Sequence, residues 1–237
     1  MIALLHQYWP NYLYSDGFNY SGLVITLWLL VVSIALGFLL AVPLAIARAS
    51  GNPFLSRPVW LYTYVFRGTP LYVQLLLCYT GIYSLHFVQS NELLGEFFRS
   101  AMNCTLLAFT LNECAYATEI FAGAIKETSY SEIEAARAYG MSDFQLYTRI
   151  ILPSALRRAL PAYSNEVILM LHATTLAFTA TVPDILKAAR DANSATYMTF
   201  QAYGIAAALY AAIVFALIWA FRRMETRMLA YLKPQGH

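Results

Sequence analysis

Three glutamates stand inside segments that otherwise carry almost no charge, and they are the side chains best suited to bind a charged ligand. Glu113 and Glu119 lie in the apolar stretch 100–125, and Glu166 lies in the stretch 161–182. An ionisable group costs roughly 2.5–3.5 kcal/mol at the centre of a bilayer, whereas a leucine contributes only about 0.3–0.6 kcal/mol of stabilisation. If these stretches cross a membrane, the three carboxylates predict an electronegative pathway for a cationic ligand.

Helical spacing separates the two glutamates of the stretch 100–125. Thr105, Asn112 and Glu119 are seven residues apart and form one polar stripe, while Glu113 lies about 120° away from Glu119 around the helix. Counted from Ser100 at a rise of about 1.5 Å per residue, Glu113 lies near the middle of the membrane and Glu119 in its cytoplasmic third. Glu166 lies at a depth similar to that of Glu119. We therefore expect Glu166 and Glu119 to supply the counter-charge.

The composition requires that these glutamates lie in a membrane protein. The 237 residues are 59% hydrophobic and only 12% charged, against about 25% charged in a typical soluble domain. Such a chain has too little charge for disorder, and a soluble fold would expose too much of its apolar surface. A net charge of +2 without any basic run also argues against nucleic-acid binding.

The charge-poor stretches predict an all-α polytopic membrane protein with five transmembrane helices. A span needs about 20 mostly apolar residues. Twelve Lys and Arg residues then fall on one side and three on the other, which places the N-terminus in the periplasm and the C-terminus in the cytoplasm. Because the first basic residue is Arg48, we expect no cleavable signal peptide. The expected spans are 21–47, 59–86, 100–125, 161–182 and 203–221, between an interfacial segment 1–20 and a cytoplasmic tail 222–237.

The long polar loop 126–160 is predicted to form two short helices on the cytoplasmic side. Capping boxes at 131–134 (S-x-x-E) and 142–145 (S-x-x-Q) indicate two helix starts. Gly140 stands where a left-handed cap would end the first helix, and Pro153 is expected to stop the second. On these grounds alone, the loop could equally be an ordinary amphipathic connector.

The residues of this loop resemble the EAA signature of the membrane subunits of bacterial ABC importers. Three further stretches, 66–71, 115–120 and 161–166, resemble the polar amino-acid branch of that family, and the similarity is greatest to M-type subunits of permeases for histidine, lysine, arginine and ornithine. The resemblance covers almost the whole chain and implies a type I importer transmembrane fold. It also implies an ATPase-coupling role for Glu134, Ala135, Ala136, Gly140, Ile150, Leu152 and Pro153.

The resemblance implies partners as well. They are two ATP-binding subunits, a second homologous membrane subunit forming a heterodimer, a periplasmic amino-acid-binding protein and the lipid bilayer. The sequence contains no Gly-Lys pair, so it has no phosphate-binding loop of the G-x-x-x-x-G-K-[ST] type, and we expect a partner rather than this chain to hydrolyse ATP. No cofactor or metal is expected, because Cys78, Cys104 and Cys114 lack metal-site spacing and suit buried packing positions.

A basic amino acid is the substrate that this combination favours. Gly68, Thr69 and Pro70 weaken their helix, and freed backbone groups there, with Asn112, are expected to receive the α-carboxylate and α-amino groups. Glu113 and His172 are weaker candidates, since His172 suits an interior position as well. Glu119 could instead anchor two helices, and the membrane half could lack a defined substrate site.

Three other functions compete with this interpretation. The same machine could import glutamine, another polar amino acid or an opine. An ion-coupled secondary transporter is disfavoured because such folds usually show repeated halves, which this sequence lacks. A non-transporting scaffold would leave the cost of the buried acids unexplained.

Overall fold

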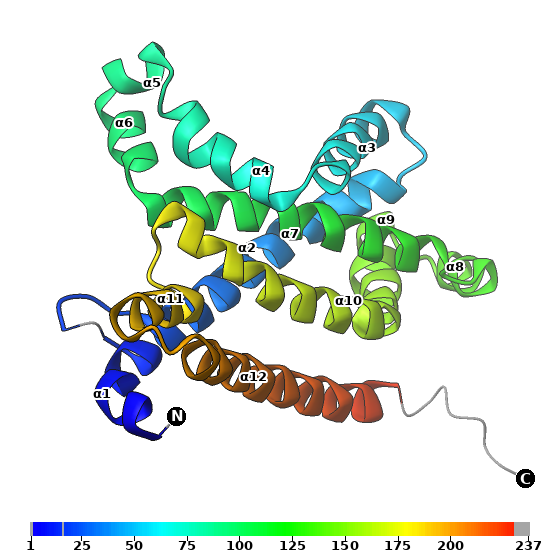
Figure 1. The fold of residues 1–237 in the computed structure, drawn as a ribbon. Helices are drawn as coiled ribbons and strands as arrows, with labels where there is room; N and C mark the ends of the chain where they lie inside the picture. Colours follow the sequence, from blue (N-terminus) through cyan, green and yellow to red (C-terminus); the bar gives the residue numbers. More distant parts are fainter. Residues whose placement is uncertain (1, 16, 230–237) are drawn as a thin grey trace, which may run out of the picture.

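The computed structural model describes residues 2–15 and 17–229, and side chains from residue 6 onward. Within these residues the chain is helical, with isolated bridges but no β-strand. Three irregular helical segments join the α-helices: π-helical Leu77–Ile82 and Tyr147–Ile151, and 3-10 Thr175–Ala180. The α-helices (Figure 1) are α1 Ile2–Leu13, α2 Gly22–Ala49, α3 Pro53–Gly68, α4 Leu71–Leu76, α5 His86–Ser90, α6 Glu92–Arg99, α7 Ala101–Lys126, α8 Tyr130–Ala138, α9 Asp143–Leu146, α10 Leu152–Thr174, α11 Ile185–Thr196 and α12 Thr199–Met228.

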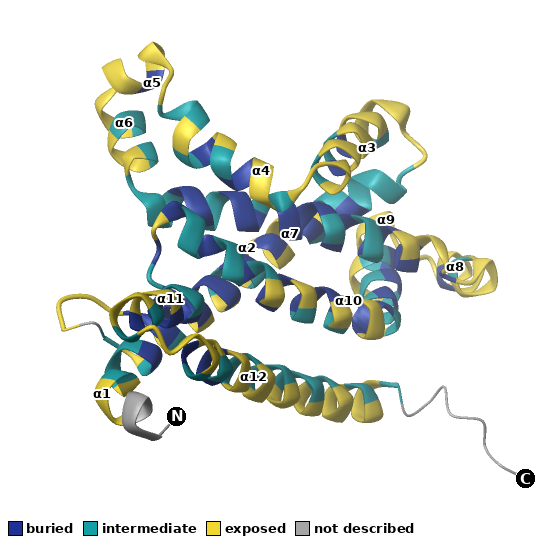
Figure 2. Cartoon of the chain, in the orientation of Figure 1, coloured by how far each residue is buried: buried dark blue, intermediate teal, exposed yellow. Residues whose placement is uncertain are grey.

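Helices α2 and α7 pack along each other and form the centre of the molecule. Their contact depends on Gly37, because a Cβ atom there would lie 2.6 Å from Cγ of Glu113. Helix α10 packs on α7 from another side, and its Tyr163 ring contacts Phe121 of α7. Buried residues therefore run along most of α7, as Figure 2 shows.

The expected spans meet the observed helices with two differences. Helices α2 and α12 are long and apolar enough to cross a membrane, whereas α7 and α10 are long but carry glutamates. The expected span 59–86 is not one helix, since α3 ends at Gly68 and α4 starts at Leu71. The expected span 161–182 starts too late, because α10 begins at Leu152.

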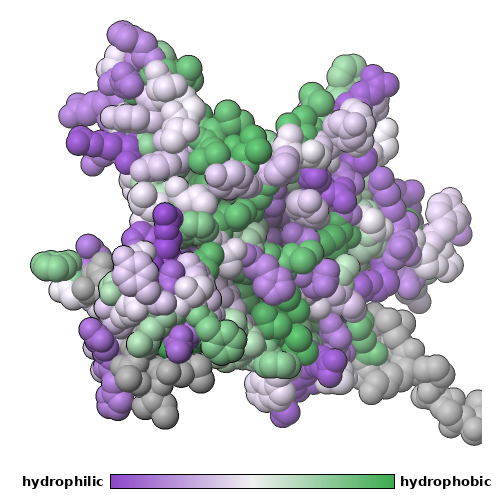
Figure 3. Space-filling model, viewed as in Figure 1, coloured by the Kyte–Doolittle hydropathy of each residue, from purple (hydrophilic) through white to green (hydrophobic). Residues whose placement is uncertain are grey.

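The short helices gather at the two ends of the molecule. Helices α1, α5, α6 and α11 lie at the end opposite to α8 and α9 (Figure 1), and hydrophilic side chains mark α5, α6 and α8 in Figure 3. We call these the α11 end and the α8 end. Tyr12 of α1 is buried at the α11 end and donates a hydrogen bond to the carbonyl of Ala202, which is 3.0 Å away.

Asp184 ties the α11 end together. Its Oδ1 accepts the amide N–H of Lys187 at 2.8 Å and caps α11, while its Oδ2 accepts the hydroxyl of Tyr210 at 3.2 Å. Burial raises the pKa of this carboxyl group, which lies beyond the expected span, to about 7. These contacts fix the position of α11 on α12.

Candidate functional site

The break between α3 and α4 is built around extended backbone at Thr69 and Pro70. The Gln74 amide closes it by donating to the carbonyls of Phe66 (2.7 Å) and Thr69 (3.1 Å). Asn112 of α7 donates to the Phe66 carbonyl at 3.3 Å and to Oε1 of Gln74 at 3.1 Å. The expected local weakening of the helix is thus present. Asn112 uses the N–H groups of its amide to stabilise this break. Because these donors are already engaged, they are not free to bind a substrate carboxylate, which is the role expected of Asn112.

Gly68 stays open beside this break. No heavy atom would come within 4 Å of a Cβ added there, and Thr69 and Pro70 are exposed. The Gly68-Thr69-Pro70 segment therefore keeps an accessible surface in this chain.

Glu119 is held by two partners from other helices. Its Oε1 accepts Nε of Arg48 at 2.8 Å and the hydroxyl of Thr63 at 2.6 Å. Glu119 is therefore paired with a basic side chain, in contrast to the free counter-charge that the sequence predicts. Arg48 was missed because it lies 71 residues earlier in the chain. These contacts match the alternative in which Glu119 anchors α7 to α2 and α3.

Glu166 keeps its carboxylate available. It is largely buried on α10 and forms no hydrogen bond or ion pair within the described residues. Arg67 lies close enough for its charge to act on the carboxylates of both Glu166 and Glu119. The Arg67 guanidinium lies 5.2 Å from the centre of the Tyr116 ring, and the Tyr116 hydroxyl reaches the Arg67 carbonyl at 3.5 Å. The exposed guanidinium of Arg67 and the carboxylate of Glu166 are therefore two charged groups without an ion-pair partner among the described residues.

Arg67 is the residue that the sequence reasoning missed at this site. We counted it with the basic residues of one membrane side, although it directly precedes the Gly68-Thr69-Pro70 segment. A guanidinium can bind a carboxylate through two parallel hydrogen bonds. Arg67 and Glu166 together could therefore hold a zwitterion that carries an additional positive charge.

Glu113 lies in the closed interior between α2, α7 and α10. Its side chain is fully buried, and neither carboxylate oxygen has a hydrogen-bond partner among the described residues. The nearby Tyr163 hydroxyl is likewise buried and unpaired within that part of the chain. Glu113 is therefore separated from the accessible surface around Gly68 and Arg67.

His172 lies on the surface of α10 and not in the interior of this chain, and its role as a candidate ligand stays a prediction. Asn165, Leu169 and His172 are all exposed and recur at intervals of four and three residues, which places them on one helical face. Asn165 is a further polar group on this face that the site prediction did not include.

The end of α8 is shaped by Gly140. This residue has a φ of +77°, its amide donates to Arg137, and the amide of Met141 donates to Ala136. These bonds form a Schellman motif, which confirms the predicted left-handed cap. The predicted box at Ser131 is wrong, because α8 begins at Tyr130 with Ser129 as its N-cap.

The start of α9 confirms the second capping box. The Ser142 hydroxyl accepts the amide of Gln145 at 3.4 Å, and the Gln145 side chain accepts the amide of Ser142 at 3.1 Å. Pro153 does not stop this helix, so that expectation is wrong. It lies in the first turn of α10, directly after the π-helical segment Tyr147–Ile151, and the helical run continues through it.

The seven expected coupling residues divide into an anchored group and an accessible group. Ala136 is buried in the core, and Ile150 and Leu152 pack against it, with Pro153 half-buried. Glu134, Ala135 and Gly140 stay exposed. Ala136 therefore belongs to the anchored group and not to the accessible surface.

Three aromatic side chains extend the accessible surface of the loop. Tyr139 is 88% exposed, Phe144 77% and Tyr130 73%. Exposed apolar side chains that cluster on one element mark interaction surfaces. Arg158 of α10 ties the start of the loop to α7. Its guanidinium donates to the Ala124 carbonyl at 3.0 Å and to the Thr128 hydroxyl at 2.9 Å.

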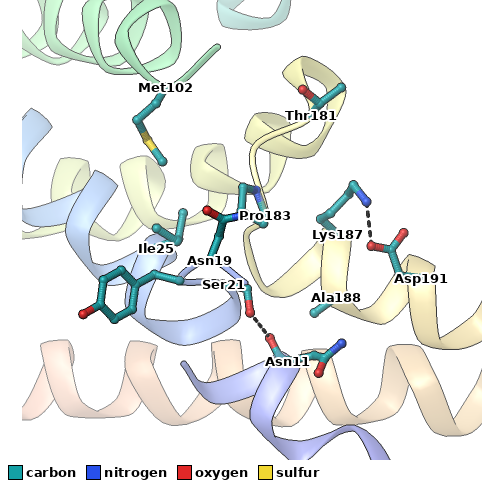
Figure 4. A pocket seen from close by; sticks show the side chains of 11 residues that line it. Asn11, Asn19, Ser21, Ile25, Met102, Thr181, Pro183, Lys187, Ala188 and Asp191 are labelled. Atoms are coloured by element: carbon teal, nitrogen blue, oxygen red, sulfur yellow. Dashed lines mark hydrogen bonds and ion pairs between the residues drawn. The ribbon is translucent and has the colours of Figure 1, made fainter. Parts of the chain in front are cut away.

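The α11 end contains a polar cavity of about 490 Å³. Figure 4 shows the Lys187–Asp191 ion pair on one side of it and Ser21, which donates to the Asn11 carbonyl at 2.9 Å, on the other. Helix α11, the start of α2 and the loop around Pro183 surround it. This hollow is distinct from the surface formed by Arg67 and Glu166.

The cysteines take no part in either region. Cys78, Cys104 and Cys114 are free and buried, which agrees with packing positions. In the part of the chain that the structure covers, no group of three or more His, Cys, Asp or Glu side chains could hold a metal ion.

Comparison with known proteins identifies the family. Residues 33–229 match the family model described as "binding-protein-dependent transport system inner membrane component". The chain belongs to this family. The permease has the type I ABC importer fold, and in such importers separate ATPase subunits hydrolyse ATP.

Relatives of the permease include two histidine/lysine/arginine/ornithine transport system permease proteins named HisM. The one from Escherichia coli K12 is 62% identical over 236 residues, covering 100% of this chain and 99% of the relative. The one from Salmonella typhimurium LT2 is 62% identical over 235 residues, covering 99% and 100%. The nopaline transport system permease protein NocM of Agrobacterium fabrum is 42% identical over 192 residues, covering 81% and 80%.

Two solved structures share the fold of the permease. A crystal structure of an amino acid ABC transporter with histidines has a TM-score of 0.80 and 28% identity, and the match covers 96% of this chain and 98% of that chain. The MetNI methionine ABC transporter in an inward facing conformation has a TM-score of 0.69 at 17% identity, covering 86% and 93%. The second likeness supports the fold alone.

Proposed function

We propose that the permease is one membrane subunit of an ATP-driven, binding-protein-dependent importer of basic amino acids: histidine, lysine, arginine and ornithine. The observation that carries this proposal is the 62% identity, over the full length of both chains, to permeases named for these substrates. The chain forms half of the translocation pathway, and a second, homologous membrane subunit forms the other half.

The proposed membrane arrangement has five spans with the α11 end in the periplasm and the α8 end in the cytoplasm. It is supported by the gathering of α1, α5, α6 and α11 at one end and of α8 and α9 at the other. The excess of Lys and Arg on the α8 side gives the orientation. The polar cavity near Lys187 then faces the side from which a binding protein delivers its amino acid.

Glu166 is the proposed counter-charge for the cationic side chain of the substrate. Among the described residues its carboxylate has no ion-pair partner, whereas that of Glu119 is bound by Arg48. Arg67 is the proposed partner of the substrate α-carboxylate, and the exposed Gly68-Thr69-Pro70 segment supplies further backbone groups. Glu119 then positions α3, from which Arg67 extends.

The loop with α8 and α9 is the proposed docking element for the ATPase. Glu134, Ala135 and Gly140 are accessible there, beside the aromatic rings of Tyr139 and Phe144. Ile150, Leu152 and Arg158 anchor the loop to the core, so a force applied at the docking surface reaches α7 and α10 directly.

Uptake in liposomes tests the substrate assignment. Because Glu166→Gln removes the charge that pairs with a cationic side chain, lysine and arginine uptake should fall at least tenfold in kcat/KM, with ATPase coupling kept. Arg67→Gln should reduce uptake of every amino acid alike, because all share the α-carboxylate. Glu96→Gln on exposed α6 is the matched control. Unchanged lysine uptake by Glu166→Gln would refute the counter-charge role.

An opine importer is the second candidate, because the relatives include a nopaline permease at 42% identity. The same assay separates the two functions. Competition of labelled lysine uptake by histidine, arginine and ornithine, but not by nopaline or glutamine, supports the first proposal. The reverse pattern supports the second.

A further inference from the structure

A second, apolar hollow lies between α10 and α12 near the α8 end. Its volume is about 400 Å³, within the range of about 300–1,000 Å³ typical of ligand pockets. Helices α2 and α7 form its floor, where the rings of Phe38, Phe121 and Tyr163 contact each other at centroid distances of 5.1–5.8 Å. The walls come from Leu156 and Leu160 of α10 and from Phe221, Met224 and Met228 of α12.

The groove runs lengthwise along α10 and α12. Its α10 wall runs from Pro153 to Tyr163, ten residues that rise about 15 Å. A hydrocarbon core is about 30 Å thick. Hydrophobic side chains also gather on the surface between α10 and α12 in Figure 3. Arg157 stands six residues, about 9 Å, before Tyr163, so the part of the groove beyond it is long enough for the first part of an acyl chain.

Arg157 gives the groove a charged mouth. It lines the hollow, is exposed, and forms no hydrogen bond or ion pair within the described residues. Its neighbour Arg158, in contrast, is bound to Ala124 and Thr128. The same end of α12 carries Arg222, Arg223 and Arg227, also without ion pairs among the described side chains.

The only acid on this part of α12 is Glu225, and it does not line the groove. Its carboxylate accepts a hydrogen bond from the hydroxyl of Ser164, which is 3.4 Å away. The mouth therefore combines free guanidinium groups with an apolar interior, a pattern that suits a phosphate group joined to a hydrocarbon chain.

We propose that this groove binds the acyl chain of an anionic phospholipid, with Arg157 holding the phosphate of its headgroup. The inference rests on the proposed membrane placement and is independent of the substrate. The lipid fills the space between α10 and α12. It thereby contributes to the packing of the end that carries the coupling loop.

Photo-crosslinking of the full-length permease in native-like bilayers tests the proposal. The probes are phosphatidylglycerol and phosphatidylcholine, each with a diazirine on the acyl chain. We expect phosphatidylglycerol to label Leu156 and Leu160 about fivefold more strongly, since one basic residue contributes about 1 kcal/mol toward an anionic lipid. Arg157→Gln should remove this preference, whereas Arg57→Gln, on exposed α3, should keep it.

A second pair of variants tests the groove itself. Met224→Trp fills the hollow from an exposed wall and should abolish labelling by both lipids, while Val31→Trp, on the exposed face of α2, should not. Equal labelling by the two lipids in the wild type, or an unchanged preference in Arg157→Gln, would overturn the assignment. Crosslinking of residue 224 to a second membrane subunit in place of lipid would also overturn it. Lysine uptake measured in parallel reports separately on the proposed function.

Discussion

The coupling loop and the polar stripe of α7 carry most of the polar side chains that the sequence singles out, and they use them in opposite ways. In the loop, hydrogen bonds join residues a few positions apart, such as Gly140 with Arg137 and Ser142 with Gln145. On α7, Glu119 binds Arg48, 71 residues away, and Asn112 binds Gln74, 38 residues away. The helix ends of the loop are shaped by local bonds, although Arg158 also joins the loop to α7, whereas the polar groups of the α7 stripe bind other helices.

This difference decides which groups remain available to other molecules. The loop satisfies its backbone locally and leaves Glu134, Tyr139 and Phe144 exposed. The α7 stripe uses Asn112 and Glu119 in helix packing. Among the described residues, the ionisable groups near it without an ion pair are Glu166, Arg67 and the fully buried Glu113. A polar side chain inside a span is therefore evidence of a site only after its internal partners are known.

Removing the long-range ion pair is expected to have the largest effect. Arg48→Ala leaves the Glu119 carboxylate without its cation in a largely buried position. Breaking a buried pair in this way costs about 3 kcal/mol, which lowers the unfolding midpoint by roughly 6–12 °C for a chain of this size. Thermal unfolding in detergent, followed by tryptophan fluorescence, measures the change.

The double variant Arg48→Ala, Glu119→Ala provides the control for that prediction. If the two side chains stabilise the fold through each other, the double variant loses clearly less stability than the sum of the single variants. Additive losses would show that Glu119 anchors α7 through Thr63 alone and would weaken the contrast with the loop.

Close packing of α2 on α7 gives the second prediction. Gly37→Ala places a Cβ 2.6 Å from Cγ of Glu113, so one helix must shift, and overpacking of this kind costs about 1–3 kcal/mol. Gly123→Ala is the matched control, since no heavy atom would come within 4 Å of its Cβ and alanine favours the helix by up to about 1 kcal/mol. Equal unfolding midpoints for the two variants would contradict the close approach.

Whether a residue's contacts lie near it in the sequence or far from it also explains what the sequence could predict. Gly140 and the box at Ser142 were found because capping depends on residues within one turn. Ser131 was misassigned because Ser129 stands two positions earlier and serves as the N-cap. Pro153 was misread because proline is common both after a helix and in its first turn.

The candidate site was harder to predict because its contacts join separate helices. Periodicity placed Asn112 and Glu119 on one face of α7 correctly, but it could not show that α3 and α4 occupy that face. Arg67 falls within the expected span 59–86, but its neighbours along the chain could not show which side chains of other helices lie around it. Burial and partner identity are properties of the packed helices.

Within the loop, the left-handed turn is expected to be the most sensitive point. Gly140 has a φ of +77°, and an L-residue there costs roughly 1–2 kcal/mol. Gly140→Ala should therefore loosen α8 locally and lower ATPase stimulation, while the unfolding midpoint of the whole chain changes by less than in Gly37→Ala. Limited proteolysis of the loop and stimulated ATPase activity in liposomes measure both effects. A normal cleavage pattern together with full stimulation would argue against this role.

The capping box offers the smallest and most local test. Ser142→Ala removes the hydroxyl that accepts the Gln145 amide, and loss of such a cap costs about 1 kcal/mol. Because α9 continues through Tyr147–Ile151 into α10, fraying should stay in the loop and appear as faster hydrogen exchange at residues 143–146. Ser142→Asp should restore protection, since aspartate caps equally well, whereas Thr148→Ala, with its hydroxyl on an internal carbonyl, should leave exchange at 143–146 unchanged. If Ser142→Ala instead destabilised α7 or the contact between Arg48 and Glu119, the loop and the α7 stripe would be coupled, and the contrast between self-contained and packing-dependent polar groups would no longer hold.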